Sequence, residues 1–140
     1  MKKHGFSLIE VLIAILLVGL AIASLVVANG SFTKANAAAT DLSTAEFLIE
    51  QIRERTALLS FDALEGMTIL YSPPINANGE ALNNFAAFSQ QVTVENVSAS
   101  NFENLESGSD FIRVTVKVFL NSKQISSASW LRADIPIIEN

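Results

Sequence analysis

The side chains that carry most enzyme chemistry are scarce in this chain. Its 140 residues contain no cysteine and a single histidine, His4. Cysteine nucleophiles, thiolate metal sites and disulfides are therefore excluded, and His4 alone would have to serve any Ser-His-Asp or histidine–zinc arrangement. Aspartate and glutamate are frequent but stand in no recognisable catalytic motif, and the glycines form no phosphate-binding loop. We expect no enzymatic activity, no metal and no cofactor.

A single carboxylate, Glu10, interrupts an otherwise uncharged apolar segment. From Phe6 to Ala28, 19 of 23 residues are hydrophobic. As a helix the segment would be ~35 Å long, which is enough to cross ~30 Å of hydrocarbon. A carboxylate within it costs about 2–3 kcal/mol, so Glu10 requires compensation. Two simpler interpretations are an incidental charge that reaches the membrane interface and a secretory signal that is cut after Ala23.

The sequence KKHGFSLIEVLIA at residues 2–14 resembles the prepilin signal of type IV pilins and type II secretion pseudopilins. The resemblance implies that a membrane prepilin peptidase cuts between Gly5 and Phe6 and then methylates the new amino group of Phe6. It also implies that Glu10 pairs with the N-terminal amine of a neighbouring subunit. Two opposite charges that are each costly in an apolar bundle become tolerable when they meet, and the pair sets the axial register. Cleavage would also remove His4.

The charges at the start of the chain predict its orientation and its partners. Lys2 and Lys3 precede the apolar segment, so the positive-inside rule places the N-terminus in the cytoplasm. We expect a single-pass protein of the bacterial inner membrane with an external head. Its expected partners are prepilin peptidase, the membrane through the segment from Phe6 to Ala28, and other pilin or pseudopilin subunits. A secreted or single-span anchored binding protein that does not assemble is the alternative.

Net charge disfavours direct binding of nucleic acid. The formal charge is −5, and removal of Lys2 and Lys3 leaves 7 basic against 14 acidic residues, a charge of −7. Such an excess of acidic residues disfavours binding to a negatively charged phosphate backbone. No small-molecule substrate is expected either.

The chain divides into a leader at residues 1–5, an assembly helix at 6–29, an amphipathic continuation of that helix at 30–60 and a globular head at 61–140. Apolar or small residues recur in the continuation at alternating steps of three and four, which is the spacing of a helix stripe. Charged residues between them indicate a solvated face. The stripe comprises Ala35, Ala38, Leu42, Ala45, Ile49, Ile52, Thr56 and Leu59.

The head is expected to be an antiparallel three-stranded sheet that packs on the helix, in an α+β fold. The predicted strands are residues 88–97, 111–120 and 125–135, after a connecting region with turns and a short strand at 68–71. Alternation predicts which side chains face inward, and residues 121–123 are expected to form a hairpin turn. The inward set comprises Val92, Val94, Ile112, Val114, Val116, Val118, Leu131, Ala133 and Ile135.

Two further features suggest binding. The acidic loop at residues 98–110 carries Glu103, Glu106 and Asp110, whose oxygens suit a hard cation such as calcium, although solvated hairpin loops have the same composition. Trp130, with Phe119 and Phe102 near in sequence, is either a contact for a partner subunit or a core residue.

The sequence also departs from the family pattern. Many major pilins carry a helix-bending proline near Val27 or Ala28 and a C-terminal cysteine pair. This chain has neither, and Gly19 is the only weak point of its first helical segment. These departures favour a minor pilin or a minor, I-type-like pseudopilin over a main filament subunit.

Overall fold

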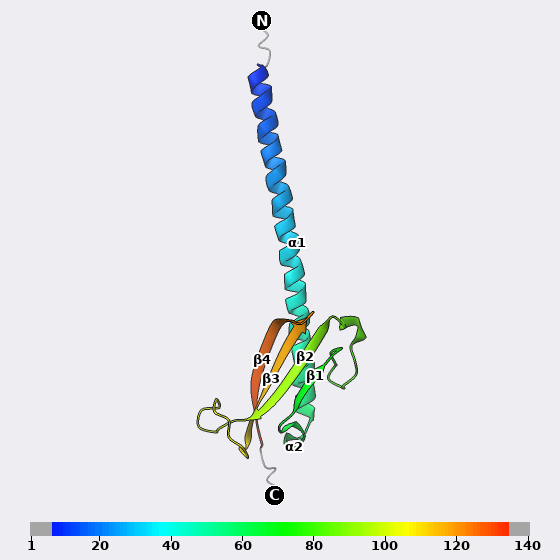
Figure 1. The fold of residues 1–140 in the computed structure, drawn as a ribbon, viewed down its shortest axis with the longest axis vertical. Helices are drawn as coiled ribbons and strands as arrows, with labels where there is room; N and C mark the ends of the chain where they lie inside the picture. Colours follow the sequence, from blue (N-terminus) through cyan, green and yellow to red (C-terminus); the bar gives the residue numbers. More distant parts are fainter. Residues whose placement is uncertain (1–6, 135–140) are drawn as a thin grey trace. The chain divides into compact units, whose positions relative to one another are not determined.

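The computed structural model describes residues 7–134. The leader, with Lys2, Lys3 and Gly5, lies outside the described residues, as do Phe6 and Ile135. The chain forms one long helix and then a meander of strands (Figure 1). The elements are α1 (Leu8–Leu58), α2 (Phe61–Leu64), β1 (Thr68–Tyr71), the 3-10 helix η1 (Asn83–Phe85), β2 (Phe88–Asn96), β3 (Phe111–Leu120) and β4 (Lys123–Ala133).

The single long helix predicted over residues 6–60 is confirmed from Leu8 to Leu58, over which α1 is continuous. It passes through both Gly19 and Gly30 without a break. The chain separates into two compact units, residues 1–40 and 41–140. In the first unit every described residue from Leu8 onward is helical, and the second unit contains the end of α1 and the whole sheet.

The α+β fold is confirmed, but the sheet has four strands rather than three. Its order is β1-β2-β3-β4, and all neighbouring strands are antiparallel. The additional strand is β1, which pairs along its whole length with β2 from Thr68 opposite Thr93 to Tyr71 opposite Gln90. Four residues carry too little alternation to show that a strand joins a sheet, so its membership depended on a partner distant in sequence.

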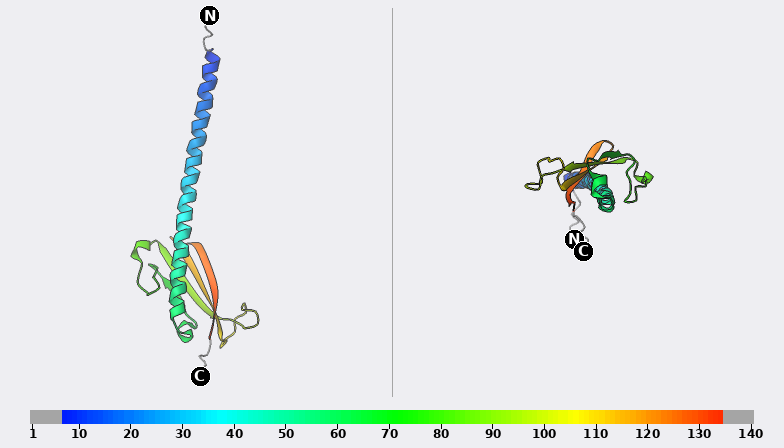
Figure 2. Two further views of the ribbon diagram at one scale, coloured as in Figure 1. Left: turned by 180° about the vertical axis from the view of Figure 1, so that it is seen from behind. Right: turned by 90° about the horizontal axis from the view of Figure 1, so that it is seen from below.

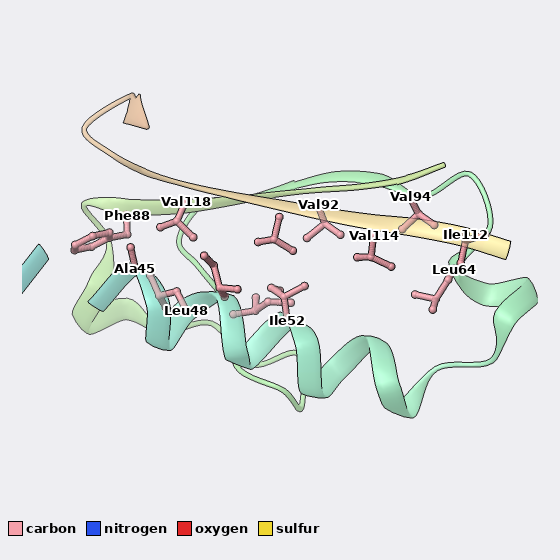
Figure 3. Close-up of a cluster of buried hydrophobic side chains, with 13 residues drawn as sticks. Ala45, Leu48, Ile52, Leu64, Phe88, Val92, Val94, Ile112, Val114 and Val118 are labelled. Atoms are coloured by element: carbon pink, nitrogen blue, oxygen red, sulfur yellow. The ribbon is translucent and has the colours of Figure 1, made fainter. Parts of the chain in front are cut away.

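The core of the second unit lies between the end of α1 and one face of the sheet (Figure 3). The alternating valines and Ile112 of β2 and β3 point toward the helix as predicted, and most of them are completely buried. The helix stripe is also confirmed for its second half, with Leu48 as an unpredicted member. The buried residues of α1 are Ala45, Leu48, Ile49, Ile52 and Thr56.

The prediction for the inner face of the last strand is wrong by one residue. Val114 lies opposite Trp130 and Val116 lies opposite Ala128, so Ala128 and Trp130 face the helix. Leu131 lies on the outer face and is 46% exposed, and Ala133 shares that face. Because side chains alternate along a strand, a shift of one residue exchanges all of its faces.

The hairpin predicted at residues 121–123 is confirmed and sets the start of β4. Asn121 and Ser122 adopt positive φ angles of 47° and 68°, as a two-residue hairpin turn requires. Leu120 and Lys123 pair across the turn. The register between β3 and β4 then shifts between Val118 and Phe119. This shift contributes to the one-residue error in the predicted inner face of β4.

A buried glutamine connects three parts of the second unit. Gln90 on β2 is fully buried, and its side-chain amide donates to the carbonyl oxygen of Leu48 at 2.8 Å and to that of Ile75 at 3.3 Å. Its side-chain oxygen accepts from the amide of Ile75 at 2.8 Å. The side chain therefore joins α1, β2 and the loop between β1 and η1. Such a residue satisfies backbone groups that would otherwise be buried without a partner.

We predict that Gln90→Ala lowers the free energy of unfolding by about 2–4 kcal/mol, because it leaves the backbone groups of Ile75 without partners and opens a cavity. Urea unfolding of the full chain in detergent, followed by tryptophan fluorescence, measures the loss. The neighbouring Gln91→Ala, on the outer face of the sheet, is the matched control and should change stability by less than about 0.5 kcal/mol. Equal effects of the two substitutions would contradict the role of Gln90.

Candidate processing and assembly helix

The start of α1 is stabilised by Ser7. Its hydroxyl oxygen accepts a hydrogen bond from the amide of Ile9 at 3.2 Å, and its carbonyl oxygen accepts from the amides of Glu10 and Val11 at 3.0 and 3.3 Å. Serine at the helix start followed three residues later by glutamate has the spacing of a capping box. This cap was not predicted, although the Ser-x-x-Glu spacing from Ser7 to Glu10 is visible in the sequence.

Glu10 lies in the first turn of α1 and is exposed. A carboxylate there interacts favourably with the positive end of the helix dipole. Among residues 7–134, the ion pairs are Arg53–Glu50 and Arg113–Glu95, so no described side chain neutralises Glu10. The structure thus brings Glu10 close to Ser7. The predicted cleavage site between Gly5 and Phe6, with Lys2 and Lys3, lies outside the described residues.

The apolar half of α1 is long enough and apolar enough to cross a membrane. An 18-residue window within Leu8–Leu58 has a mean hydropathy of 3.1, and none of that window is buried within the chain. Large side chains are exposed all around this part of the helix, including Leu8 at 81% and Val27 at 70%. A helix that is apolar on every side requires apolar surroundings, which lipid or other helices supply.

The few hydroxyl groups on this part of α1 are satisfied within the helix itself. Ser24 donates to the carbonyl oxygen of Leu20 at 2.9 Å, and Ser31 donates to that of Val27 at 3.1 Å. Hydroxyl groups bonded in this way need no water, so they are compatible with an apolar environment. From Leu8 to Ala28, Glu10 is therefore the one polar side chain that no other residue among 7–134 compensates.

Gly19 leaves open space on this helix. A side chain added at Gly19 would meet no atom within 4 Å, and the same is true at Gly30. Neither glycine has a positive φ angle, and neither is needed for packing within the chain. A helix surface without a side chain allows another helix to approach closely.

Trp130 is a packing residue in this structure. It is half-buried against the hydrophobic core, and the guanidinium carbon of Arg53 lies 5.1 Å from the centre of its ring, which is a cation–π geometry. Of the aromatic residues named with it, Phe102 packs edge-on against Phe111 instead, with 5.3 Å between ring centres. Core packing, the second of the two expected roles, is the one observed.

The acidic loop at residues 98–110 uses its polar groups on its own backbone. The side-chain oxygen of Asn101 accepts from the amides of Glu103 and Asn104, and an isolated bridge joins Val97 to Leu105. Among residues 7–134, no group of three or more acidic or histidine side chains lies where it could hold a metal ion. The structure gives no support to calcium binding by this loop, the less favoured of its two interpretations.

Two contacts between α1 and β4 were not predicted. Ser126 donates to the carboxylate of Glu46 at 2.6 Å. The guanidinium of Arg132 donates to the carbonyl oxygen of Thr56, which is one of the free carbonyls in the last turn of α1. A cation at this end of a helix both satisfies a carbonyl and stabilises the helix dipole. These residues attach the edge strand β4 to the helix.

Comparison with known protein families matches residues 1–27 to the prokaryotic N-terminal methylation motif. No curated protein and no solved structure matches the chain. The motif implies processing by prepilin peptidase and assembly with other pilins, and the apolar helix that follows it fits anchoring in a membrane. The motif, followed by an apolar helix, supports the type IV pilin and pseudopilin family for this chain.

Proposed function

We propose that this protein is a structural subunit of a type IV pilus or a type II secretion pseudopilus, and that it has no enzymatic activity. It enters the bacterial inner membrane with its N-terminus in the cytoplasm and its head outside. Prepilin peptidase cuts between Gly5 and Phe6 and methylates Phe6, and the remaining helix assembles with other subunits. The methylation motif at residues 1–27, carried on an apolar helix, is the observation that supports this function.

The isolated charge of Glu10 supports assembly rather than simple anchoring. An anchor alone gains nothing from a carboxylate that costs about 2–3 kcal/mol in hydrocarbon. In a bundle of helices, the same carboxylate can pair with the amine that cleavage creates at Phe6 of a neighbour. The pair forms at one relative height of the two helices, so it sets the axial register as well as neutralising both charges.

The finer assignment is to a minor pilin or a minor pseudopilin. The chain has no proline near Val27 or Ala28, and α1 is continuous through this region. It also has no cysteine pair to hold the end of the head. Both features are common in major pilins and their absence here supports a minor subunit, including the I-type pseudopilin.

We predict that Gly5→Leu blocks processing, because a bulky side chain cannot enter a peptidase site shaped around glycine. The unprocessed chain should stay in the membrane fraction and show the larger mass on immunoblots, while His4→Ala, also in the leader, is cleaved normally. Mass spectrometry of the wild-type protein should find N-methylated Phe6 as its first residue. A mature protein that begins at Ser24 would instead show a secreted protein released by a signal peptidase.

We predict that Glu10→Ala leaves insertion and cleavage intact but lowers the assembled fraction at least about tenfold, which corresponds to the loss of about 1.4 kcal/mol per contact. The assembled fraction is measured by shearing and sedimenting filaments from cells that contain the complete machinery. Glu10→Gln should fail to the same extent, because the charge is required and not the shape. Ser24→Ala, a small change on the same helix, is the control. Normal assembly of both Glu10 variants would refute the register role.

A further inference from the structure

The sheet of the second unit has two edges with very different properties. β1 forms one edge and β4 the other, and no other described strand pairs with either of them on the outside. β1 has four residues and is followed by Pro73 and Pro74. β4 has eleven residues and forms the outer margin of the sheet in the two opposite side views (Figures 1 and 2).

β4 lacks the devices that normally prevent a sheet edge from pairing. It contains no proline and no glycine, and its charges, Lys123 and Arg132, lie near its two ends. From Gln124 to Leu131 it is uncharged. Natural edge strands are usually short, or carry lysine, proline or a bulge in their middle, whereas the irregularity here lies at Val118/Phe119, near the hairpin end. An edge of this kind is a template for an additional extended strand.

The hydrogen-bond pattern shows which groups are available. The amide of Asp134 donates to the carbonyl of Asp110, so along β4 the even-numbered residues bond to β3. In an antiparallel ladder the odd-numbered residues of β4 then point their amide and carbonyl groups away from β3. These are Ser127, Ser129, Leu131 and Ala133. The same reasoning applies to β1. The amide of Val94 donates to the carbonyl of Met67, so Thr68 and Leu70 point their backbone amide and carbonyl groups away from β2.

The directions of the two edges allow them to pair with each other. In an antiparallel sheet of four consecutive strands, β1 and β4 run in opposite directions. A second copy in the same orientation therefore brings its β1 antiparallel to β4 of the first. Antiparallel pairing of β4 with β4 would need a two-fold axis between the two copies. That axis would reverse, in the second copy, the direction of the part of α1 that runs along the sheet in Figure 3. Two copies anchored in one membrane share a direction, so the β1–β4 pairing is the compatible one.

One exposed leucine on each edge defines the register. Leu70 is 63% exposed on β1 and Leu131 is 46% exposed on β4. Leu70 lies opposite Gln91, and Leu131 lies opposite Arg113. Gln91 and Arg113 alternate with the buried residues of their strands, so both leucines lie on the face of the sheet that points away from α1. Leu70 and Leu131 are also among the edge residues whose backbone amide and carbonyl groups point away from the sheet. Pairing Leu70 with Leu131 buries two apolar side chains against each other and places Ser72 opposite Ser129.

We propose that β4 of one subunit pairs antiparallel with β1 of a second copy of this chain, with Leu131 opposite Leu70, so that one sheet continues into the next. The inference rests on the proposed function for the membrane anchor that gives the copies a common direction. It adds a contact between heads to the contact between helices. The partner is recognised by the free backbone groups of an extended strand and by one leucine.

Cysteine cross-linking in cells tests this pairing, because the chain has no cysteine of its own. Residues directly opposite each other on paired strands lie within the Cα separation that a disulfide spans. Leu70→Cys with Leu131→Cys, in the full chain, should give disulfide-linked dimers or longer multiples after oxidation. Leu70→Cys with Lys117→Cys is the matched control, because Lys117 lies on an interior strand, and it should give no such products.

The single variants distinguish the possible pairings. Leu70→Cys and Leu131→Cys should each remain monomeric when expressed alone and should form a dimer when expressed together. Dimers from Leu131→Cys alone would show β4–β4 pairing and overturn the proposal. Cross-linked species whose mass is not a whole multiple of the mass of this chain would show a different neighbour and would also overturn it. Absence of cross-links in filaments that assemble normally would refute the pairing while leaving the proposed function intact.

A proline at position 129 provides a second test. The amide of Ser129 faces away from β3, so Ser129→Pro removes no bond from the internal ladder. It does remove the amide that would reach Ser72 of the second copy. Added to the chain that carries both Leu70→Cys and Leu131→Cys, Ser129→Pro should abolish the cross-link, while the far-ultraviolet circular dichroism of the protein stays unchanged. An undiminished cross-link in this variant would contradict the proposed ladder.

Discussion

The packing of the end of α1 on the valines of β2 and β3 is the contact on which the second unit depends. The helix contributes one narrow stripe, from Ala45 to Thr56, and the sheet contributes one face. Burial of each large aliphatic side chain contributes about 1.5–3 kcal/mol. Neither partner can bury its apolar side chains without the other, since an isolated amphipathic helix or a single exposed sheet would leave them in water.

Other features of the second unit follow from this contact. Gln90 reaches the carbonyl of Leu48 only because β2 lies directly over that turn of the helix. Arg132 reaches the end of the helix, and Arg53 reaches Trp130, because β4 lies beside the same segment. The polar contacts at the margins therefore orient a helix and sheet that apolar packing has already brought together.

The other half of α1 obeys a different constraint. Its side chains are apolar on every side, and its hydroxyl groups bond to its own carbonyls. It gains nothing from water and requires lipid or other helices as surroundings. Glu10 is the exception, and a partner charge on a neighbouring subunit is the simplest compensation. Processing at Gly5 and Phe6 would create that charge, which links the methylation motif to assembly through electrostatics.

The sequence by itself determined the long helix, its membrane-compatible half, the position of Glu10 and the inner faces of β2 and β3. Each of these depends on the period of apolar residues within one segment, which is a local property. The tertiary structure decided that β1 joins the sheet, that Trp130 rather than Leu131 faces the core, and that a glutamine is buried. These depend on strand register and on hydrogen-bond partners distant in the sequence. The alternation within a single strand contains neither, so only the folded chain could show them.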